Sequence, residues 1–187
     1  MISMNKRQLR TQLRSLHEGK AVRDAQSAGI CRQILDSSVY RNAHIIGGYM
    51  PLAHEADITP VLLDALCCGK KLVLPLCGAA PNMTLRQVSS MEELIPGAYG
   101  IMEPSSEAPI VPPQCVDLLL VPLEGIDRTG FRLGKGGGYY DCLLSSTEAV
   151  TIGCALSWQW VDEVPREPWD RRLSACADML GMHEFKQ

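Results

Sequence analysis

Apolar residues near the start of the chain recur at helical spacing. Leu9, Leu13 and Leu16 lie three or four positions apart, while basic residues repeat every fourth position on another face, from Lys6 to Arg14. Spacing of three to four residues places side chains on one face of a helix. The pattern therefore predicts a basic amphipathic helix from Lys6 to Leu16.

Short apolar runs bounded by turn residues alternate with further helical patterns along the rest of the chain. Thr59 followed by Pro60 indicates a helix start, with Thr59 as the N-cap and Pro60 as the first helical residue, and Gly69 ends that segment. Other helices are expected at residues 24–35 and 137–144, and buried strands at residues 44–49, 71–76, 117–122 and 150–155.

This alternation of strands and helices predicts the fold class. We expect a single α/β domain over residues 1–187, with a largely parallel sheet flanked by helices. The Pro-rich stretch from Pro104 to Pro113 is interpreted as a surface loop of that domain. In such folds, ligands bind beyond the carboxyl ends of the strands.

Composition and charge restrict the class of ligand. A formal charge of −3 and a pI near 5.8 argue against a surface built to bind nucleic acid or anionic lipid. No apolar run approaches the roughly 18 residues of a membrane-spanning helix. We expect a soluble, cytoplasmic, monomeric protein that meets a small anionic ligand at a local basic site.

The cysteines and the basic N-terminal segment each allow a second interpretation. The eight cysteines show no CxxC spacing and mostly lie in apolar runs, so we interpret them as reduced core thiols rather than as a zinc site or a catalytic thiol. The segment from Met1 to Arg23 is rich in Lys and Arg, a composition that transit peptides share.

Four glycines lie within five positions between a predicted strand and a predicted helix. Gly134, Gly136, Gly137 and Gly138 allow positive φ and let backbone N–H groups approach an anion without a Cβ in the way. The following helix adds the positive end of its dipole. The arrangement is typical of phosphate binding.

Charged residues beside the glycines extend this interpretation. Arg132 and Lys135 supply charge for a polyphosphate, and Asp141 lies where a carboxylate can bind Mg²⁺ on phosphate oxygens. The pattern matches neither the Walker motif nor the dinucleotide fingerprint. A flexible turn with surface charges is the alternative that a glycine run alone leaves open.

The stretch LVPLEGIDRTGFRLGKGGGYYD, residues 120–141, resembles the signature of the 5-formyltetrahydrofolate cyclo-ligase family. Four other blocks resemble the family in order and spacing: KRQLR at residues 6–10, YMPLAHEADITPVL at 49–62, GKKLVLP at 69–75 and VPREPWD at 164–170. The resemblance covers nearly the whole chain and implies a single α/β domain.

That resemblance implies a reaction. The family uses ATP and Mg²⁺ to convert 5-formyltetrahydrofolate to 5,10-methenyltetrahydrofolate, releasing ADP and phosphate. ATP phosphorylates the formyl oxygen, N10 of the folate attacks the activated carbon, and phosphate leaves. Phosphoryl transfer of this kind depends mainly on positioning and charge stabilisation.

The resemblance also implies roles for individual residues. Lys6 and Arg10 match contacts to ATP phosphates, and Glu55 matches the acid that binds the pteridine ring of the folate. Asp141 and Asp170 match the two aspartates associated with Mg²⁺. The loop that the family shares between ATP and folate corresponds to Arg132, Gly134, Lys135, Gly136, Gly137, Gly138, Tyr139 and Tyr140, with Arg132 and Lys135 as catalytic residues and Tyr139 also on the folate.

Each of these residues also has a purely structural interpretation. Lys6 and Arg10 also suit a solvated helix face, Glu55 an exposed loop, and Tyr139 and Tyr140 partial burial in the core. At the level of function, the rivals are a non-catalytic folate or nucleotide sensor and a different phosphate-ligand enzyme, such as a sugar-phosphate isomerase or a CoA-transferase-like domain.

Overall fold

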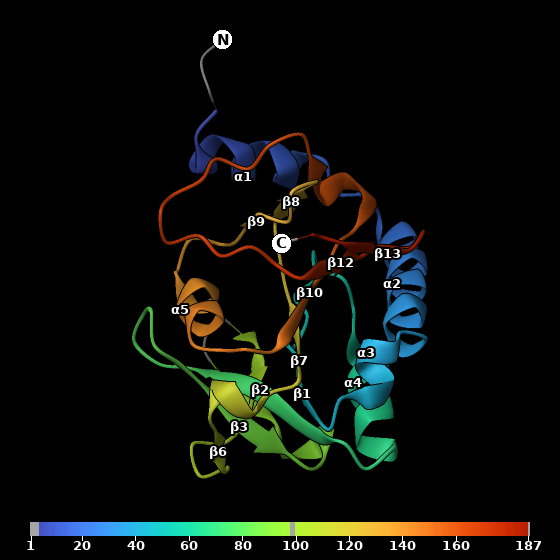
Figure 1. The fold of residues 1–187 in the computed structure, drawn as a ribbon, viewed down its shortest axis with the longest axis vertical. Helices are drawn as coiled ribbons and strands as arrows, with labels where there is room; N and C mark the ends of the chain where they lie inside the picture. Colours follow the sequence, from blue (N-terminus) through green and yellow to red (C-terminus); the bar gives the residue numbers. More distant parts are fainter. Residues whose placement is uncertain (1–3, 98–99, 187) are drawn as a thin grey trace.

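The computed structural model describes residues 4–97 and 100–186 and is built around an eight-stranded sheet (Figure 1). Its strand order is β13-β12-β10-β7-β1-β2-β3-β6. The strands are β1 (Ile45–Gly47), β2 (Lys71–Cys77), β3 (Met83–Val88), β6 (Ile110–Val111), β7 (Leu118–Val121), β10 (Val150–Cys154), β12 (Ala175–Ala177) and β13 (Met182–Glu184). The run from β12 to β2 is parallel, and β13, β3 and β6 pair antiparallel at the two sides.

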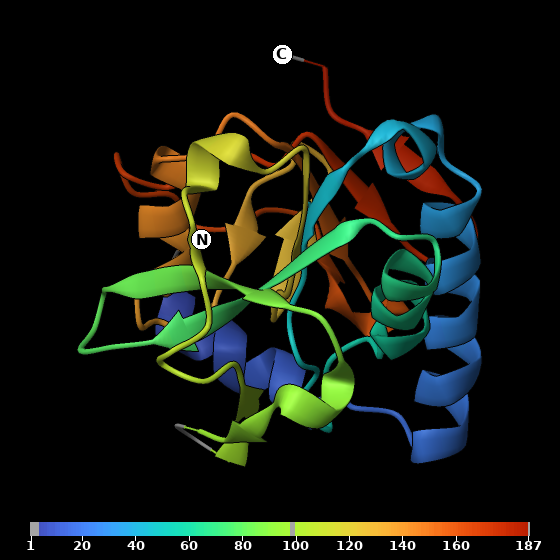
Figure 2. The ribbon, with the colours of Figure 1, turned by 90° about the horizontal axis from the view of Figure 1, so that it is seen from below.

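Helices cover both faces of the sheet, as the alternation of elements predicts (Figures 1 and 2). They are α1 (Lys6–Ser15), α2 (Lys20–Leu35), α3 (Ser38–Asn42), α4 (Thr59–Cys67) and α5 (Tyr139–Ser145). Smaller pieces complete the chain: β8 (Gly125–Asp127), β9 (Arg132–Leu133) and β11 (Trp160–Val161) in a second sheet, the pair β4 (Ile95–Pro96) and β5 (Met102–Glu103), and the 3₁₀ turns η1 (Met91–Glu93), η3 (Pro113–Cys115) and η4 (Ser157–Gln159). The prediction of a mixed α/β fold with a largely parallel sheet is confirmed.

Strand β7 shows how one apolar run serves two cores. Leu118 and Leu120 pack with the residues of α2 and α4, whereas Leu119 and Val121 face the core on the side of α5. Successive side chains of a strand point to opposite faces, so a strand covered on both faces is apolar throughout. Complete burial of each of these Leu and Val side chains stabilises the fold by roughly 1.5–3 kcal/mol.

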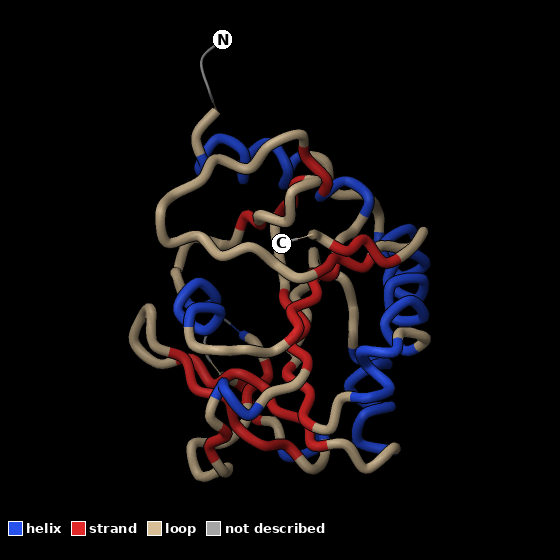
Figure 3. Tube along the Cα trace, in the orientation of Figure 1, coloured by secondary structure: helices blue, strands red, loops and turns tan. Residues whose placement is uncertain are grey.

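Helix α1 packs as an integral part of the fold. Asn5 caps it and forms a capping box with Gln8, and Leu9 and Leu13 are buried against a small cluster that includes Leu133. The leucines form one stripe of the helix and the basic residues form a neighbouring stripe, so the predicted amphipathic helix is confirmed. Residues 162–174 form a long connection, mostly loop, that passes beside α1 (Figure 3).

Element boundaries differ from the sequence prediction in places. Helix α2 begins at Lys20, four residues before the expected start. In α4 the cap position falls on Ile58, and Thr59 is the first helical residue, because the Asp57 carboxylate accepts a hydrogen bond from the Thr59 N–H at 3.0 Å. The Pro-rich loop is also not wholly irregular, since its end forms strand β6 beside β3.

The interpretation of the cysteines as core thiols is wrong for most of them. All eight are free, but the buried ones are Cys31, Cys154 and Cys176. Cys67 and Cys68 lie at the exposed end of α4. Apolar neighbours in sequence did not imply burial, because a helix turns each successive residue by about 100°. No helix within residues 4–97 and 100–186 is long and apolar enough to cross a membrane.

Candidate active site

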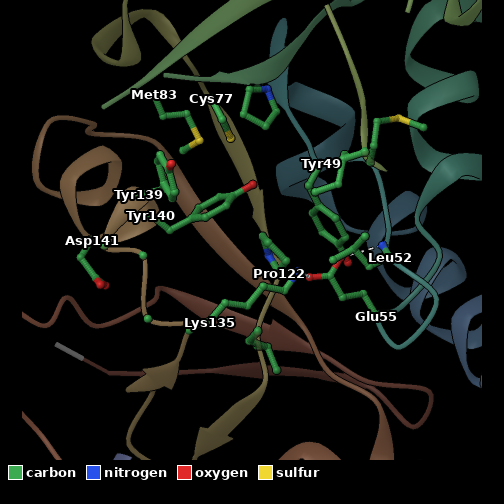
Figure 4. Close-up of a pocket in the computed structure, with 18 of the residues that line it drawn as sticks. Tyr49, Leu52, Glu55, Cys77, Met83, Pro122, Lys135, Tyr139, Tyr140 and Asp141 are labelled. Atoms are coloured by element: carbon green, nitrogen blue, oxygen red, sulfur yellow. Dashed lines mark hydrogen bonds and ion pairs between the residues drawn. The ribbon is translucent and has the colours of Figure 1, made fainter. Parts of the chain in front are cut away.

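A cavity of about 400 Å³ opens where the parallel strands end (Figure 4). Tyr49 follows β1, Cys77 ends β2 and Pro122 follows β7, and all three line it. The rest of the lining comes from the loop that carries Glu55, the start of β3, the glycine loop and the segment that carries β5. The prediction that ligands bind beyond the carboxyl ends of the strands agrees with this position.

Glu55 lies at the base of this cavity in an ion pair. Its side chain is 3% exposed, its Oε2 accepts a hydrogen bond from the Leu52 N–H at 2.8 Å, and its Oε1 lies 2.6 Å from Lys135 Nζ. Figure 4 shows Lys135 extending from the glycine loop across the cavity toward Glu55. Glu55 is therefore not an exposed loop acid.

Tyrosines surround the centre of the same cavity (Figure 4). The Tyr139 hydroxyl donates to the Gly78 carbonyl at 3.1 Å, and Tyr140 packs partly against the core. Burial raises the pKa of both Tyr49 and Tyr140, which keeps their hydroxyls protonated. Their rings form a flat, largely apolar part of the cavity wall. Tyr140 therefore both packs partly against the core, as the alternative interpretation expected, and lines the cavity.

Cys77 and Glu103 form another part of the wall that the sequence reasoning missed. Glu103 is 4% exposed, and burial together with its neighbouring carboxylate raises the pKa of Cys77 to about 11. Cys77 could have been found from its place at the end of a parallel strand. Nothing in the sequence around Glu103 indicated the cavity.

A second cavity, of about 530 Å³, lies on the other side of the glycine loop. Its lining is strongly polar and comes from α1, the loop and the connection after β11. The two cavities share Arg132, Gly134, Gly136, Gly138 and Asp141, so the loop forms the partition between them.

Arg132 is a buried cation at this partition. It is 6% exposed, its Nη2 donates to Asp141 Oδ1 at 2.7 Å, and it lies 5.7 Å from the centre of the Tyr140 ring. Burial lowers the pKa of Arg132, while Asp141, Tyr140 and Asp170 oppose that effect. An arginine stays charged in these conditions, so Arg132 presents a fixed positive charge to both cavities.

Lys6 is held by two carboxylates in the polar cavity. Its Nζ donates to both oxygens of Asp170 at 2.7 Å and to Glu167 at 2.8 Å. Partial burial by itself would lower the pKa of Lys6. The hydrogen bonds to Asp170 and Glu167 outweigh this effect, so the pKa of Lys6 is raised overall. The structure thus brings together Lys6 and Asp170, which are 164 positions apart in the sequence. Glu167 was not anticipated.

Arg10 fixes the glycine loop against α1. Its Nε donates to the Gly134 carbonyl at 2.7 Å. Of the four loop glycines, Gly136 and Gly138 use the positive φ that glycine allows (99° and 74°), whereas Gly134 and Gly137 do not. Within the described ranges, the backbone N–H groups of residues 134–138 have no acceptor in the protein, so they are available to an anion in either cavity.

The acidic residues proposed for a metal lie in the same polar cavity. Asp141 and Asp170 both line it, although each is paired with a cationic side chain. In the part of the chain that the structure describes, no three His, Cys, Asp or Glu side chains are arranged as a metal cage. The donor set fits Mg²⁺, which binds through one or two carboxylates together with substrate phosphates and water.

These features define an α/β protein in which a polar cavity and a largely apolar cavity share one glycine loop. The chain belongs to the 5-formyltetrahydrofolate cyclo-ligase family, whose model matches residues 2–177. A 5-formyltetrahydrofolate cyclo-ligase from Escherichia coli strain K12 is 30% identical over 139 residues, which cover 71% of this chain and 76% of the relative. A probable 5-formyltetrahydrofolate cyclo-ligase from Schizosaccharomyces pombe is 29% identical over 193 residues, covering 93% and 95%.

Solved structures agree with this assignment. The structure of Aquifex aeolicus 5,10-methenyltetrahydrofolate synthetase superposes with a TM-score of 0.87 at 30% identity, over 98% of this chain and 94% of that one. The structure of a 5,10-methenyltetrahydrofolate synthetase from Mycoplasma pneumoniae shares the fold with a TM-score of 0.76 at 21% identity, over 94% and 99%. The resemblance seen in the sequence is confirmed.

Proposed function

We propose that this chain catalyses the ATP- and Mg²⁺-dependent cyclisation of 5-formyltetrahydrofolate to 5,10-methenyltetrahydrofolate, with release of ADP and phosphate. Family membership supports the folate reaction. The observation that carries the nucleotide part is the pair of cavities, one apolar and one polar, on either side of the glycine loop. Such a partition can hold two ligands with their reacting groups at one place.

The polar cavity is the proposed site of the ATP phosphates. Lys6 and Arg10 project into it from α1, and Arg132 lies at its inner end. The open N–H groups of the glycine loop add further donors. Fixed donors of this kind stabilise the charge that develops during phosphoryl transfer.

Asp141 and Asp170 are the proposed contacts for Mg²⁺. Both carboxylates line the cavity that contains the basic residues. When bound, Mg²⁺ would neutralise charge on the phosphate oxygens. The arriving phosphates would draw Lys6 away from Asp170, because a polyphosphate offers more negative charge than a carboxylate. Arg132 would remain at the partition because it is buried.

The apolar cavity is the proposed folate site. Glu55 presents carboxylate oxygens that match ring N–H donors of a pteridine, and Tyr139 forms a side wall. If those donors take over the Glu55 oxygen that Lys135 now contacts, Lys135 becomes available to the transferring phosphoryl group. Substrate binding and preparation of the catalytic lysine are thereby coupled.

The proposed chemistry proceeds in two stages. The formyl oxygen attacks the γ-phosphorus and ADP leaves. N10 then attacks the formyl carbon, the C–O bond breaks with loss of phosphate, and N10 loses its proton. Arg132 and Lys135 stabilise the charge on the transferred group at the partition. The protein's main contribution is orientation, since well-oriented reactants gain several kcal/mol of barrier reduction.

The proposal places the enzyme in the cytoplasm as a monomer acting on a small molecule. Eight free cysteines, several of them exposed, support a reducing compartment. The mildly acidic pI supports a small-molecule partner rather than nucleic acid.

The proposal is tested by mixing the purified protein with 5-formyltetrahydrofolate, Mg²⁺ and ATP, and following absorbance near the methenyl-folate band. We expect growth of that band that requires both ATP and Mg²⁺, with stoichiometric ADP release. The Lys135→Ala variant should reduce the rate on the order of 10²-fold. Folate binding without an ATP-dependent product would contradict the proposal and favour the non-catalytic sensor.

A further inference from the structure

Trp169 is an exposed indole at the rim of the polar cavity. Its side chain is 60% exposed, in contrast to Trp158, which is 9% exposed. Trp160 has Arg128 over its face and forms a T-shaped contact with His183. Among residues 4–97 and 100–186, no ring contact involves Trp169. A large exposed aromatic side chain that lines a cavity is typical of a ligand contact.

The turn that carries Trp169 is tightly fixed. The Glu167 N–H donates to Asp170 Oδ2 at 2.7 Å, and the Asp170 N–H donates to the Glu167 carbonyl at 3.0 Å. Lys6 then binds the side chains of both acids. The indole is therefore presented by a rigid turn that is joined to the helix carrying the basic residues.

Trp169 also differs chemically from the rest of the cavity. The lining that the structure describes is otherwise made of basic, acidic, amide, glycine and proline residues, and Trp169 is its aromatic member. The volume of about 530 Å³ suits a ligand larger than a phosphate chain. A ligand with an anionic end for Arg132 and a flat aromatic end for the rim matches this distribution.

We propose that Trp169 is the base-stacking residue of the nucleotide site and contributes affinity for the base of ATP independently of its phosphates. This inference rests on the proposed function, because it assigns the polar cavity to a nucleoside triphosphate. Bases stack on aromatic faces with little sequence preference, since every base has a π-face. Trp169 therefore determines base affinity and has no part in phosphoryl transfer.

The test compares MgATP with magnesium tripolyphosphate, which has the phosphates without the base. Isothermal titration calorimetry is applied to the wild type, Trp169→Ala, Trp169→Phe and Arg10→Ala. For Trp169→Ala we expect ATP affinity to fall about tenfold, tripolyphosphate affinity to stay within about twofold, and Trp169→Phe to retain most ATP affinity. Arg10→Ala should weaken both ligands. Addition of ATP, and not of tripolyphosphate, should quench indole fluorescence in the wild type and not in Trp169→Phe.

Other outcomes separate the two proposals. If Trp169→Ala weakens both ligands equally, weakens neither, or raises the KM for the folate instead, the stacking role is overturned while the nucleotide site stands. If the wild type binds neither ATP nor tripolyphosphate, the nucleotide site fails and the stacking role with it. Thermal unfolding of Trp169→Ala should match the wild type because the residue is exposed.

Discussion

At the residue scale, the site keeps its charges paired. The cation–carboxylate pairs are Lys6 with Asp170, Arg132 with Asp141, and Lys135 with Glu55. Each pair avoids leaving a partly buried charge without a partner, which is costly. In the proposed complex, phosphates would compete for the cations, and Mg²⁺ or ring N–H groups for the carboxylates, so ligand binding exchanges partners rather than exposing charge.

Asp141→Asn tests the metal side of this exchange. An amide retains the size of the carboxylate but loses the charge for Mg²⁺ and for Arg132, so we expect kcat to fall on the order of 10²-fold and the Mg²⁺ concentration for half-maximal rate to rise. Steady-state rates across a Mg²⁺ titration measure both effects. Asp162→Asn, at an exposed position, is the control and should behave as the wild type. An unchanged Mg²⁺ requirement would remove Asp141 from the metal site.

At the element scale, helix α1 links the packing of the core to the proposed nucleotide site. Leu9 and Leu13 anchor it on Leu133, and the neighbouring stripe of the helix presents Lys6 and Arg10 to the polar cavity. The position of the basic residues therefore depends on the buried leucines. A loosened helix would move charges away from the glycine loop even though no cavity residue had changed.

Leu13→Ala tests this dependence. Leu13 is 2% exposed, so its truncation leaves a cavity and should lower the free energy of unfolding by about 2–4 kcal/mol. Urea unfolding measures the change, and ATP affinity should decrease in parallel. Leu16→Ala is a matched control on the same segment at 48% exposure, and should change stability by less than about 1 kcal/mol. Equal effects of the two variants would argue against anchoring by Leu13.

At the scale of the whole molecule, Glu124 ties distant segments together. Its buried carboxylate accepts hydrogen bonds from Arg14 of α1 at 3.4 Å and lies 3.5 Å from His54 Nε2 on the loop that carries Glu55. The His54 ring stacks on His17. Burial alone would raise the pKa of Glu124, but the hydrogen bonds and charges of His54 and Arg14 outweigh it and lower the pKa from 4.5 to about 2.

The depressed pKa of Glu124 predicts acid sensitivity. A carboxylate whose folded pKa lies below its unfolded value stabilises the fold above pH 4.5, and that contribution is lost as pH falls toward 2. We expect the loss to be on the order of 1–2 kcal/mol, since Arg14 is half exposed and solvent screens its charge. Urea unfolding between pH 7 and this acidic range should show a shallower decline for Glu124→Gln than for the wild type. Glu18→Gln, at an exposed position, should leave the decline unchanged; a wild-type decline in Glu124→Gln would contradict the assignment.

Local patterns in the sequence determined the elements and the chemistry of the loop. The helix at α1, the apolar strand β7 and the glycine run before α5 each depend on residues close together in the chain, so spacing and residue type were sufficient. The five sequence blocks that resemble the family then supplied the proposed roles of Glu55 and Asp170. Element ends shifted by one to four residues because caps depend on local hydrogen bonds such as that from Asp57.

The tertiary structure alone decided how those pieces meet. It placed the glycine loop as a partition between two cavities, paired Lys6 with Asp170, and brought Glu103 and Trp169 to cavity walls. It also exposed cysteines that lie in apolar runs. These contacts join residues far apart in the chain, and their geometry depends on how strands and helices pack. Periodicity records which face of an element is apolar, and it carries no information about which distant side chain that element will meet.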